Sequence, residues 1–428
     1  MAKSSAQLRQ ASTASRIALA NAFRYDVLVL DAAFKQSLAS IRSLGRAGLR
    51  VAAAESFAES DPRLPVAGFR SKYSALNQVL PSYTADSAAY SSAIVQFVRE
   101  YPTPVVLPTM DGSIAAIMGV REQLADLGCS VALASNAALE IANSKERTLA
   151  LARQMGISYP RTVVIDNIGD LPKLLTEFKF PFVLKPNISW ASSAAVRLAP
   201  IEVVDESEAI ATAEQFLAAG VSVLGQQWVS GRREGITLLI TDGEVRASCA
   251  HATLRTTPAL GGASVLRESI PIPTDIFDSS VRLVRAIGLD GPCEVEFRRD
   301  EHNRPFLMEV NARLAGTLTN AIHSGVDLPL LVWKWAARLP VDYVLSYRTG
   351  VRTRWLRGDV RWLRDNSVRV GRPDSLPRAN ALLTFAAEFA RVRHYDSIHG
   401  LDLGPALGEM QIMRTAAGKA RRASNSPT

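Results

Sequence analysis

The stretch Glu294-Val-Glu-Phe-Arg-Arg-Asp-Glu-His-Asn-Arg-Pro-Phe-Leu-Met-Glu-Val-Asn-Ala-Arg313 decides the fold. Two short runs of alternating polar and apolar residues flank a polar turn at 300–304, which predicts a β-hairpin. Because successive strand residues face opposite sides, Glu296 should lie opposite Glu309 and Glu294 opposite Asn311. The reverse face should pair apolar residues, namely Val295 with Val310 and Phe297 with Met308.

The acidic face of this hairpin is typical of a metal site. Two carboxylates directly across a strand pair repel each other unless a cation or a proton lies between them. Glu296, Glu309 and Asn311 offer only oxygen ligands, which suit Mg²⁺ or Mn²⁺ bound to substrate phosphates better than zinc. The alternative is a solvent-facing hairpin whose acids pair with nearby arginines, namely Arg298, Arg299 and Arg313.

Together with Arg313, the hairpin resembles the magnesium-binding end of the ATP-grasp superfamily, whose pattern is an acidic strand, a turn and Glu-x-Asn-x-Arg. Three upstream segments are similar to family motifs in the same order, over roughly residues 100–340. Phe180-Pro-Phe-Val-Leu-Lys-Pro186 is typical of a buried strand that delivers Lys185. Lys145 opens a predicted helix, and Gln226-Gln-Trp-Val-Ser-Gly231 resembles the hinge between the two halves of the ATP-binding fold.

The resemblance implies a role for each of these residues. Lys145 and Lys185 would neutralise the phosphates of ATP, and Glu234 would hold the ribose. The hinge residues Gln226, Gln227, Trp228 and Val229 would contact the adenine. Taken separately, each lysine has a simpler interpretation: Lys145 could be a solvated helix lysine, and Lys185 could simply end a strand. A lysine in an interior cleft nevertheless needs an anionic partner, because an unpaired buried ammonium is costly.

Two features depart from the family pattern. The loop after Lys185 is usually glycine-rich, so that backbone N–H groups close on phosphates, whereas residues 187–194 contain no glycine. Their Ser and Ala side chains still permit a close approach, which indicates a modified lid. Trp190 either covers the nucleotide or packs on the neighbouring strand. The hinge carries Gln226 and Gln227 where an acid is common.

The chain opens with an α/β pattern. Residues 27–30 and 50–54 are predicted strands, and Lys35–Arg46 is a predicted helix with Leu38, Ile41 and Leu44 on one stripe. No Gly-x-Gly-x-x-Gly follows the first strand, so dinucleotide binding has little support. The predicted fold class is α/β, with α+β character in the ATP-binding part: a Rossmann-like domain followed by a two-lobed ATP-grasp fold. The predicted divisions are an N-terminal tail (1–24), an N-terminal α/β domain (25–138), a small lobe (139–225), a large lobe (226–345), a C-terminal extension (346–414) and a C-terminal tail (415–428).

Pro258 and Gly261-Gly262 predict a flexible loop within Arg255–Ser269. Arg255 and Arg267 of this segment are candidates to clamp an anionic substrate or the transferred phosphoryl group. Their alternative is a surface loop with two solvated arginines. His251 and His323 are interpreted as structural, since neither has a partner at metal-ligand spacing.

Residues 348–372 combine arginines with tryptophans, a composition also found in nucleic-acid-binding proteins. Residues 351–356 alternate like a strand and residues 359–363 like a helix. We therefore expect the tryptophans to face the core, and the arginines to line one wet face. These arginines are Arg352, Arg354, Arg357, Arg361 and Arg364.

The composition agrees with a cytoplasmic enzyme. The 428 residues suffice for two or three domains, and no apolar run reaches membrane-spanning length. Cys129, Cys249 and Cys293 are scattered without metal spacing, so a reducing compartment is expected. The net charge of +8 suits anionic substrates. Residues 1–21 are predicted to be disordered or loosely helical, and residues 415–428 are predicted to be a disordered end.

These features predict an ATP-dependent ligase that joins a small carboxylate to an amine through an acyl phosphate. Glu296, Glu309 and Asn311 would hold magnesium, while Arg313 and Arg267 would stabilise the charge that develops during transfer. Small-molecule substrates and a possible homodimer are expected, with no membrane or nucleic-acid partner. Two alternatives remain: a carboxylase or carbamoyl-phosphate-type enzyme that uses bicarbonate, and a nucleotide- or RNA-binding protein without turnover.

Overall fold

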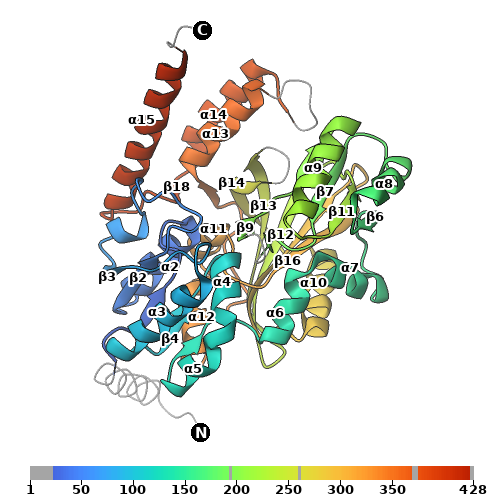
Figure 1. Cartoon of the computed structure of the whole chain (residues 1–428). Coiled ribbons are helices and arrows are strands. Elements are labelled where there is room, and N and C mark those ends of the chain that lie inside the picture. Colours follow the sequence, from blue (N-terminus) through green and yellow to red (C-terminus); the bar gives the residue numbers. More distant parts are fainter. Residues whose placement is uncertain (1–22, 192–194, 259–261, 369–374, 425–428) are drawn as a thin grey trace.

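The computed structural model describes residues 23–191, 195–258, 262–368 and 375–424. Within these ranges the chain forms sheets of five, four and seven strands and a two-stranded hairpin, with helices packed around them (Figure 1). The mixed α/β class predicted from the sequence is confirmed. The predicted domain boundaries remain predictions. No helix in the described ranges is both long enough and apolar enough to span a membrane.

The N-terminal sheet is parallel throughout, with strand order β3-β2-β1-β4-β5. The predicted βαβ opening is confirmed, because β1 and β2 pair in parallel on either side of α2. Every residue of β1, β2 and β4 is buried, as expected for parallel strands covered on both faces. The strands are β1 (Val27–Val29), β2 (Val51–Glu55), β3 (Ser74–Val79), β4 (Val105–Leu107) and β5 (Ser130–Val131), and the helices of this part are α2 (Lys35–Arg46), α3 (Ser87–Glu100), α4 (Asp111–Ile117) and α5 (Arg121–Asp126).

Helix α2 is more deeply buried than its single apolar stripe predicts. Residues 36–44 are all buried, including Arg42. The Arg42 Nε donates to the Asp402 carboxylate at 2.7 Å, and its other nitrogens donate to the carbonyls of Asp396 and Ser397. Segments distant in sequence therefore cover the polar side of α2.

The four-stranded sheet is antiparallel, with order β10-β7-β11-β6. Its helices pack on an apolar cluster of its own, which includes Phe182, Leu184 and Phe216. A larger cluster joins the N-terminal sheet to the seven-stranded sheet. The elements of this part are α6 (Asn136–Asn143), α7 (Lys145–Gln154), β6 (Thr162–Ile165), α8 (Leu171–Glu177), β7 (Phe182–Pro186), β10 (Ile201–Val203), α9 (Glu206–Ala218) and β11 (Val223–Gln227).

The seven-stranded sheet has the order β16-β15-β12-β13-β14-β17-β18 and is antiparallel except for its last pair. The flexible loop predicted over Arg255–Ser269 is wrong for most of its length. Arg255 lies on β13 and Arg267 on β14, because the residues after the turn pair with β13 on one side and β17 on the other. The turn residues 259–261 lie outside the described residues. The elements are β12 (Arg233–Thr241), β13 (Glu244–Thr257), β14 (Ala263–Ile270), α10 (Thr274–Ile287), β15 (Gly291–Arg299), β16 (Pro305–Asn311), α11 (Leu318–Ser324), α12 (Leu328–Ala336) and β17 (Arg352–Arg354).

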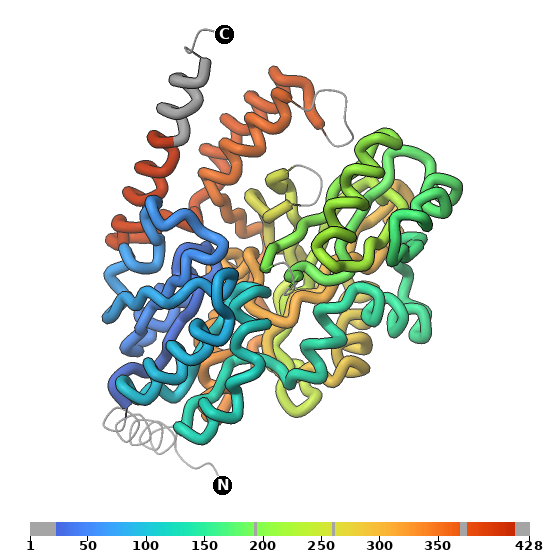
Figure 2. The backbone as a smooth tube through the Cα atoms, viewed as in Figure 1, coloured from blue at the N-terminus to red at the C-terminus, as the bar shows by residue number. Residues whose placement is uncertain are grey.

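The C-terminal segment returns to the N-terminal part, where the red helix α15 lies beside the blue elements in Figure 2. It contains α13 (Leu356–Val368), α14 (Arg378–Arg391), β18 (His394–Tyr395) and α15 (Gly404–Ser424). The disordered end predicted from residue 415 is wrong as far as 424, since these Ala-, Arg- and Lys-rich residues extend α15. Residues 1–21 and 425–428, also predicted as tails, lie outside the described residues.

For the arginine-rich segment, the predicted strand and helix are confirmed, but the predicted exposure of the arginines is partly wrong. β17 and α13 form where a strand and a helix were expected, and Trp362 is buried. Arg354, however, has no exposed surface. Its Nε donates to Asp359 at 2.7 Å, and its guanidinium stacks on Phe385 and Phe389. These partners come from α13 and α14, so the strand pattern alone does not reveal them.

Candidate active site

The acidic hairpin has the predicted register around its carboxylates. Glu296 pairs with Glu309 and Glu294 with Asn311, and the turn closes with a backbone bond from Asp300 to Arg304. The predicted pairing of Phe297 with Met308 is wrong, because the register shifts after Glu296 and Phe297 pairs with Leu307. This β-bulge adds one residue to β16.

The bulged residue, Met308, lies next to Lys185. Its sulfur is 3.9 Å from the Lys185 ammonium. A bulge re-aims side chains at the strand where it occurs, and here it places a methionine beside the lysine of a different sheet.

The pKa values of the two facing carboxyl groups are shifted in opposite directions. Burial, opposed by Arg233 and reinforced by the charge of Glu309, raises the pKa of Glu296. Burial also disfavours charge on Glu309, but Lys145 and Lys185 outweigh it and lower the pKa of that carboxyl. Glu309 is therefore the more strongly ionised member of the pair.

Asn311 bridges the two acids. Its amide nitrogen donates to Glu296 at 3.3 Å and to Glu309 at 3.2 Å, and its amide oxygen accepts from Arg313 at 3.2 Å. The three side chains predicted to hold a metal therefore come together. Rotation of the amide by about 180° would turn its oxygen toward the carboxylates, since the O and N positions of an amide are nearly isosteric.

Lys145 and Lys185 converge on Glu309 from separate elements. Lys185 is the fourth residue of the buried strand β7, as predicted, and Lys145 begins α7 behind the N-cap Ser144. Asn187, just beyond β7, joins the two elements: its carbonyl accepts from Lys145 N at 3.0 Å, and its side chain accepts from Glu146 N at 3.0 Å. Burial lowers the pKa of Lys185 to about 8 and also lowers that of Lys145, while Glu309 opposes both shifts.

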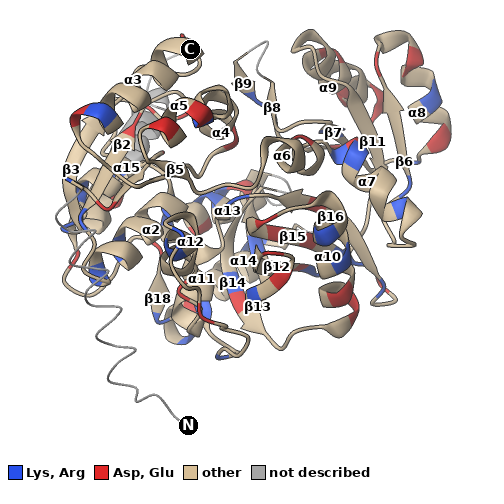
Figure 3. Ribbon diagram, turned by 90° about the horizontal axis from the view of Figure 1, so that it is seen from below, with Lys and Arg blue, Asp and Glu red and all other residues tan. Residues whose placement is uncertain are grey.

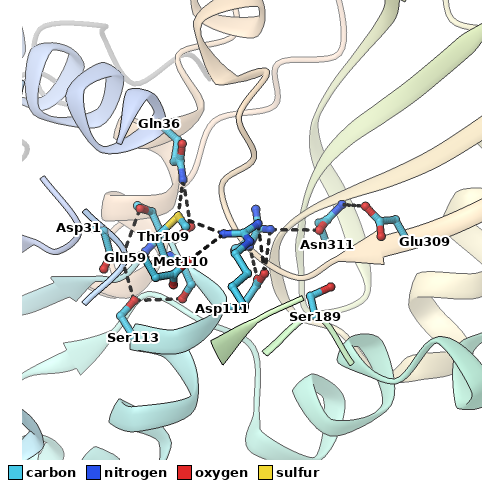
Figure 4. Close-up of polar contacts among 12 residues, drawn as sticks. Asp31, Gln36, Glu59, Thr109, Met110, Asp111, Ser113, Ser189, Glu309 and Asn311 are labelled. Atoms are coloured by element: carbon cyan, nitrogen blue, oxygen red, sulfur yellow. Dashed lines mark hydrogen bonds and ion pairs between the residues drawn. The ribbon is translucent and has the colours of Figure 1, made fainter. Parts of the chain in front are cut away.

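Arg313 is held by Asp111, a residue for which the sequence predicted no role. Its Nε donates to Asp111 at 2.6 Å, and a second nitrogen donates to Asn311. Burial disfavours charge on Asp111, but Arg313 and Arg197 outweigh it and lower the pKa of that carboxyl. Figure 4 shows Asp111, Asn311 and Glu309 along one line of polar contacts that runs from α4 to the hairpin.

Arg233 is a second residue that the sequence did not single out. Its guanidinium donates to Glu296 at 2.5 Å and to the Gly262 carbonyl at 3.2 Å. Arg233 stands on β12, next to β15, whose acidic residues are coloured red on the ribbon in Figure 3. An ion pair across neighbouring strands would be visible in the sequence only if the pairing of β12 with β15 were already known.

A cavity of about 680 Å³ opens beside the acidic hairpin. The residues that line it include the loop after β1 with residues 59–67, the acidic side of the hairpin, parts of β12, β13 and β14, and the C-terminal segment. Lys145 and Lys185 do not line it, but Lys145 donates at 3.1 Å to Ser189, which does. The cavity therefore borders the acids and Ser189 but not the two lysines themselves. The charged hairpin residues that line it are Glu294, Glu296, Glu309 and Arg313.

Solved structures share this fold. An L-amino acid ligase from Bacillus licheniformis superimposes with a TM-score of 0.56 at 18% identity, covering 74% of this chain and 75% of that one. Biotin carboxylase from Campylobacter jejuni, solved with β-γ-ATP, superimposes with a TM-score of 0.58 at 16% identity, covering 78% of this chain and 75% of that one. Likenesses of this kind establish the fold.

Sequence comparison points to the same group. A family model described as "ATP-grasp in the biosynthetic pathway with Ter operon" matches residues 255–358. D-alanine–D-alanine ligase B of Pseudomonas putida is 26% identical over 180 residues, which cover 40% of this chain and 54% of that protein. The chain belongs to the ATP-grasp superfamily. It resembles the carboxylate–amine ligases of that superfamily, and it spans about half the length of the curated relatives it matches.

The predicted ATP-grasp hinge follows β11. Gln226 is buried and donates to Thr162 at 3.1 Å, while Gln227 is exposed. Arg298 lies 4.5 Å above the Trp228 ring, and Val229 is buried. The adenine contacts predicted for these residues stay predictions.

Glu234, predicted to hold the ribose, is a buried acid with two arginine partners. Arg299 donates to one of its oxygens at 2.7 Å, and Arg232 donates to the other. Both carboxylate oxygens are thus engaged within the protein. A ribose hydroxyl would have to share an oxygen with one of these arginines.

The glycine-free loop of this ATP-grasp chain forms a small hairpin of β8 (Trp190–Ala191) and β9 (Val196–Arg197), while residues 192–194 lie outside the described residues. Trp190 packs edge-on against Tyr83 of the N-terminal part at 5.3 Å. Arg197 reaches the same part, with a nitrogen 3.6 Å from Asp111. The hairpin therefore contacts the N-terminal part from the side of the four-stranded sheet.

Arg267 and Arg255 are both ion-paired within the protein. Arg267 has no exposed surface and donates to Asp396. Arg255 donates to Asp359 at 2.9 Å and stacks on Trp362. Neither arginine lines the cavity. The substrate-clamping role predicted for them stays a prediction, and the structure does not bring them to the acidic hairpin.

His251 and His323 were interpreted as structural. His251 lines the cavity, and burial lowers its pKa to about 4, so it is neutral near pH 7. His323 stacks on His394 at 4.0 Å. In the part of the chain that the structure describes, no three His, Cys, Asp or Glu side chains cluster closely enough to hold a metal. The metal-binding role predicted for Glu296, Glu309 and Asn311 stays a prediction.

Proposed function

We propose that this ATP-grasp chain is an ATP-dependent ligase that joins a small carboxylate to an amine through an acyl phosphate. One observation carries the proposal: two lysines from different elements and two facing carboxylates meet beside a cavity large enough for small substrates. Magnesium bound to phosphates requires acids on the side of the metal and cations on the side of the phosphates. The likeness to ligases in sequence supports the same reaction class.

The acidic face fits a magnesium ion. Glu296 and Glu309 lie directly opposite each other, and Asn311 adds an amide within hydrogen-bond distance of both. This oxygen-only set leaves coordination positions for water and phosphate, which is how Mg²⁺ is usually bound. When bound, magnesium would neutralise charge on the phosphates of ATP.

The reaction transfers the γ-phosphoryl group and then displaces it. A carboxylate oxygen of the substrate attacks the γ-phosphorus, the bond to the β–γ bridging oxygen breaks, and ADP leaves. The amine then attacks the acyl carbon, the carbon–oxygen bond to phosphate breaks, and the amine loses a proton to solvent. Lys145 and Lys185 would hold the phosphates, and Arg313 would face charge on the tetrahedral intermediate. Asp111 keeps Arg313 oriented through its ion pair.

The test is magnesium-dependent release of ADP and phosphate from purified protein with pools of amino acids and small carboxylic acids. Release that needs one acid and one amine would support the ligase. Transfer of ¹⁸O from a labelled carboxylate into phosphate would support the acyl phosphate. The Glu309→Gln variant should lose release, while Glu301→Gln, at an exposed position in the hairpin turn, should keep it.

Two other outcomes would redirect the proposal. Release that needs bicarbonate in place of the organic acid would favour a carboxylase or carbamoyl-phosphate-type enzyme. ATP binding without release in any pool would favour a binding protein. RNA binding through the arginine-rich segment would have to compete with ion pairs inside the protein. Arg352 pairs with Glu268 and Glu388, and Arg354 pairs with Asp359. Homodimer formation stays a prediction, to be measured by light scattering.

A further inference from the structure

The cavity continues past the acidic hairpin to a wall made by the C-terminal segment. Trp355, Arg357 and Arg361 line this wall, and Lys35 from the start of α2 faces the same space. We call these four residues the α13 end of the cavity. Lys35 connects it to the hairpin, because Gly316, in the loop after β16, lies against the Lys35 side chain, and Thr317 donates to Glu294.

The cations at the α13 end differ from those beside the hairpin. Arg313 and Arg233 are hydrogen-bonded to Asp111 and Glu296. Lys35 donates to the Ser264 carbonyl, and within the described residues it forms no ion pair with a carboxylate. Arg361 likewise forms no ion pair with a carboxylate in the part of the chain that the structure describes.

Arg357 comes closer to an acid but does not hydrogen-bond to it. Its Nε is buried without a hydrogen-bond partner among the described residues and lies 3.6 Å from Glu409. Glu409 itself accepts from Ser397 and from Trp355 Nε1.

Trp355 brings the cations together. The Lys35 ammonium lies 5.2 Å from the centre of its ring, and the Arg357 guanidinium lies 5.3 Å from a ring centre of the same side chain. Its indole N–H donates to Glu409 at 2.8 Å, which fixes the ring. Arg361 follows Arg357 by one helical turn, so both project from the same face of α13.

The surrounding acids do not balance these charges. Asp396 and Glu409 are the acids that line this end, and Asp396 is already bound to Arg267. With Glu294 of the hairpin, which also faces Lys35, three acids therefore face four cations, namely Lys35, Arg357, Arg361 and Arg267. An anion bound in this space would offset the excess of positive charge and accept hydrogen bonds from the guanidinium groups.

We propose that Lys35, Arg357 and Arg361 form a subsite for an anionic group of the substrate, a carboxylate or a phosphate, held beside the Trp355 ring. The inference rests on the proposed ligase and sharpens it: one of the joined substrates carries an anionic group in addition to the reacting carboxylate or amine. Guanidinium groups suit this task because their planar N–H groups match the geometry of carboxylate and phosphate oxygens.

The test measures anion binding directly, without turnover. Glutarate and inorganic phosphate are titrated separately into the purified full-length protein by calorimetry, so that the two arms distinguish a carboxylate subsite from a phosphate subsite. Arg361→Gln and Arg357→Gln should each weaken binding of the preferred anion at least tenfold. Arg364→Gln removes the same charge from an exposed position of α13 outside the cavity, and it should bind within twofold of wild type.

The outcomes separate this subsite from the ligase reaction. Loss of binding in both cavity variants but not in Arg364→Gln supports the subsite, even if no substrate pool elicits ADP release. Wild-type protein that binds neither anion, or cavity variants that bind as wild type does, overturns the subsite, even if ADP release is found. Arg361 is exposed, so its variant is expected to fold and keeps the test decisive if Arg357→Gln does not.

Discussion

The two ends of the cavity carry charge in different ways. At the hairpin, each of the two facing acids is matched by a cation within the protein: Glu296 by Arg233, and Glu309 by Lys145 and Lys185. At the α13 end, Lys35, Arg357 and Arg361 have no hydrogen-bonded carboxylate among the described residues. The hairpin end is thus balanced and suited to a group that carries both signs, such as magnesium with phosphates. The α13 end is suited to an anion.

The comparison also separates what is shared by the fold from what is particular to this chain. The hairpin residues follow a pattern common to the ATP-grasp superfamily, whereas the α13 end is built from the C-terminal segment and the first residue of α2. Substrate choice is generally set by the parts of a site that vary between proteins of one fold. The predictions below test this division.

The largest effect is expected on the stability of the protein, when Asp359, which supports the α13 end, is replaced. Asp359 has no exposed surface and binds Arg354 at 2.7 Å and Arg255 at 2.9 Å. Asp359→Ala would leave two buried arginines without a carboxylate partner and should lower the free energy of unfolding by about 3–5 kcal/mol. Asp359→Asn keeps the shape and should lower it less. Guanidinium-induced unfolding measures both, and equal stability of Asp359→Ala and wild type would contradict the support role.

A slightly smaller effect is expected at the hairpin end, on activity. Glu309→Gln removes the carboxylate that faces both lysines, and ADP release should fall on the order of 100- to 1,000-fold. Unfolding should stay cooperative, because the amide has the same size. If this variant retains full magnesium-dependent release, the acids are not the metal site.

The next effect concerns phosphate binding by Lys185. Lys185→Met should weaken ATP binding by roughly ten- to a hundredfold, since a hydrogen bond to a charged group contributes about 1.5–3 kcal/mol. Lys173→Met, on the exposed surface of α8, is the matched control. Fluorescent nucleotide titration measures both. Unchanged affinity in Lys185→Met would place the phosphates elsewhere.

The smallest effect is a pH dependence at the α13 end. Burial, followed by the charge of Arg267, lowers the pKa of Lys35 to about 7, so its positive charge is lost as pH rises through that value. Binding of glutarate, whose carboxylates stay ionised, should weaken roughly three- to tenfold between pH 6.5 and 8.5. Lys35→Arg should remove this dependence, because arginine stays charged. The other charged groups that face Lys35 are Asp396, Glu294 and Glu409.

The candidate site was predictable where its residues are close in sequence. The alternation of residues 294–311 predicted the pairing of Glu296 with Glu309, and the apolar run 180–186 predicted the burial of Lys185 on a strand. The bulge at Met308 was not predictable, because one extra residue in a strand leaves no mark in an alternating pattern. Asp111 and Arg233 were missed because their partners, Arg313 and Glu296, stand 202 and 63 residues away.

The sequence by itself determined the mixed α/β class, the acidic hairpin and the order of the segments that resemble ATP-grasp motifs, since each depends on periodicity or local spacing. Only the tertiary structure decided that Arg267 is buried and paired with Asp396, and that the C-terminal segment lines the cavity. Burial and ion pairing depend on which distant segments meet. The α13 end therefore exists only because residues more than 300 positions apart, Lys35 and Trp355, share one wall.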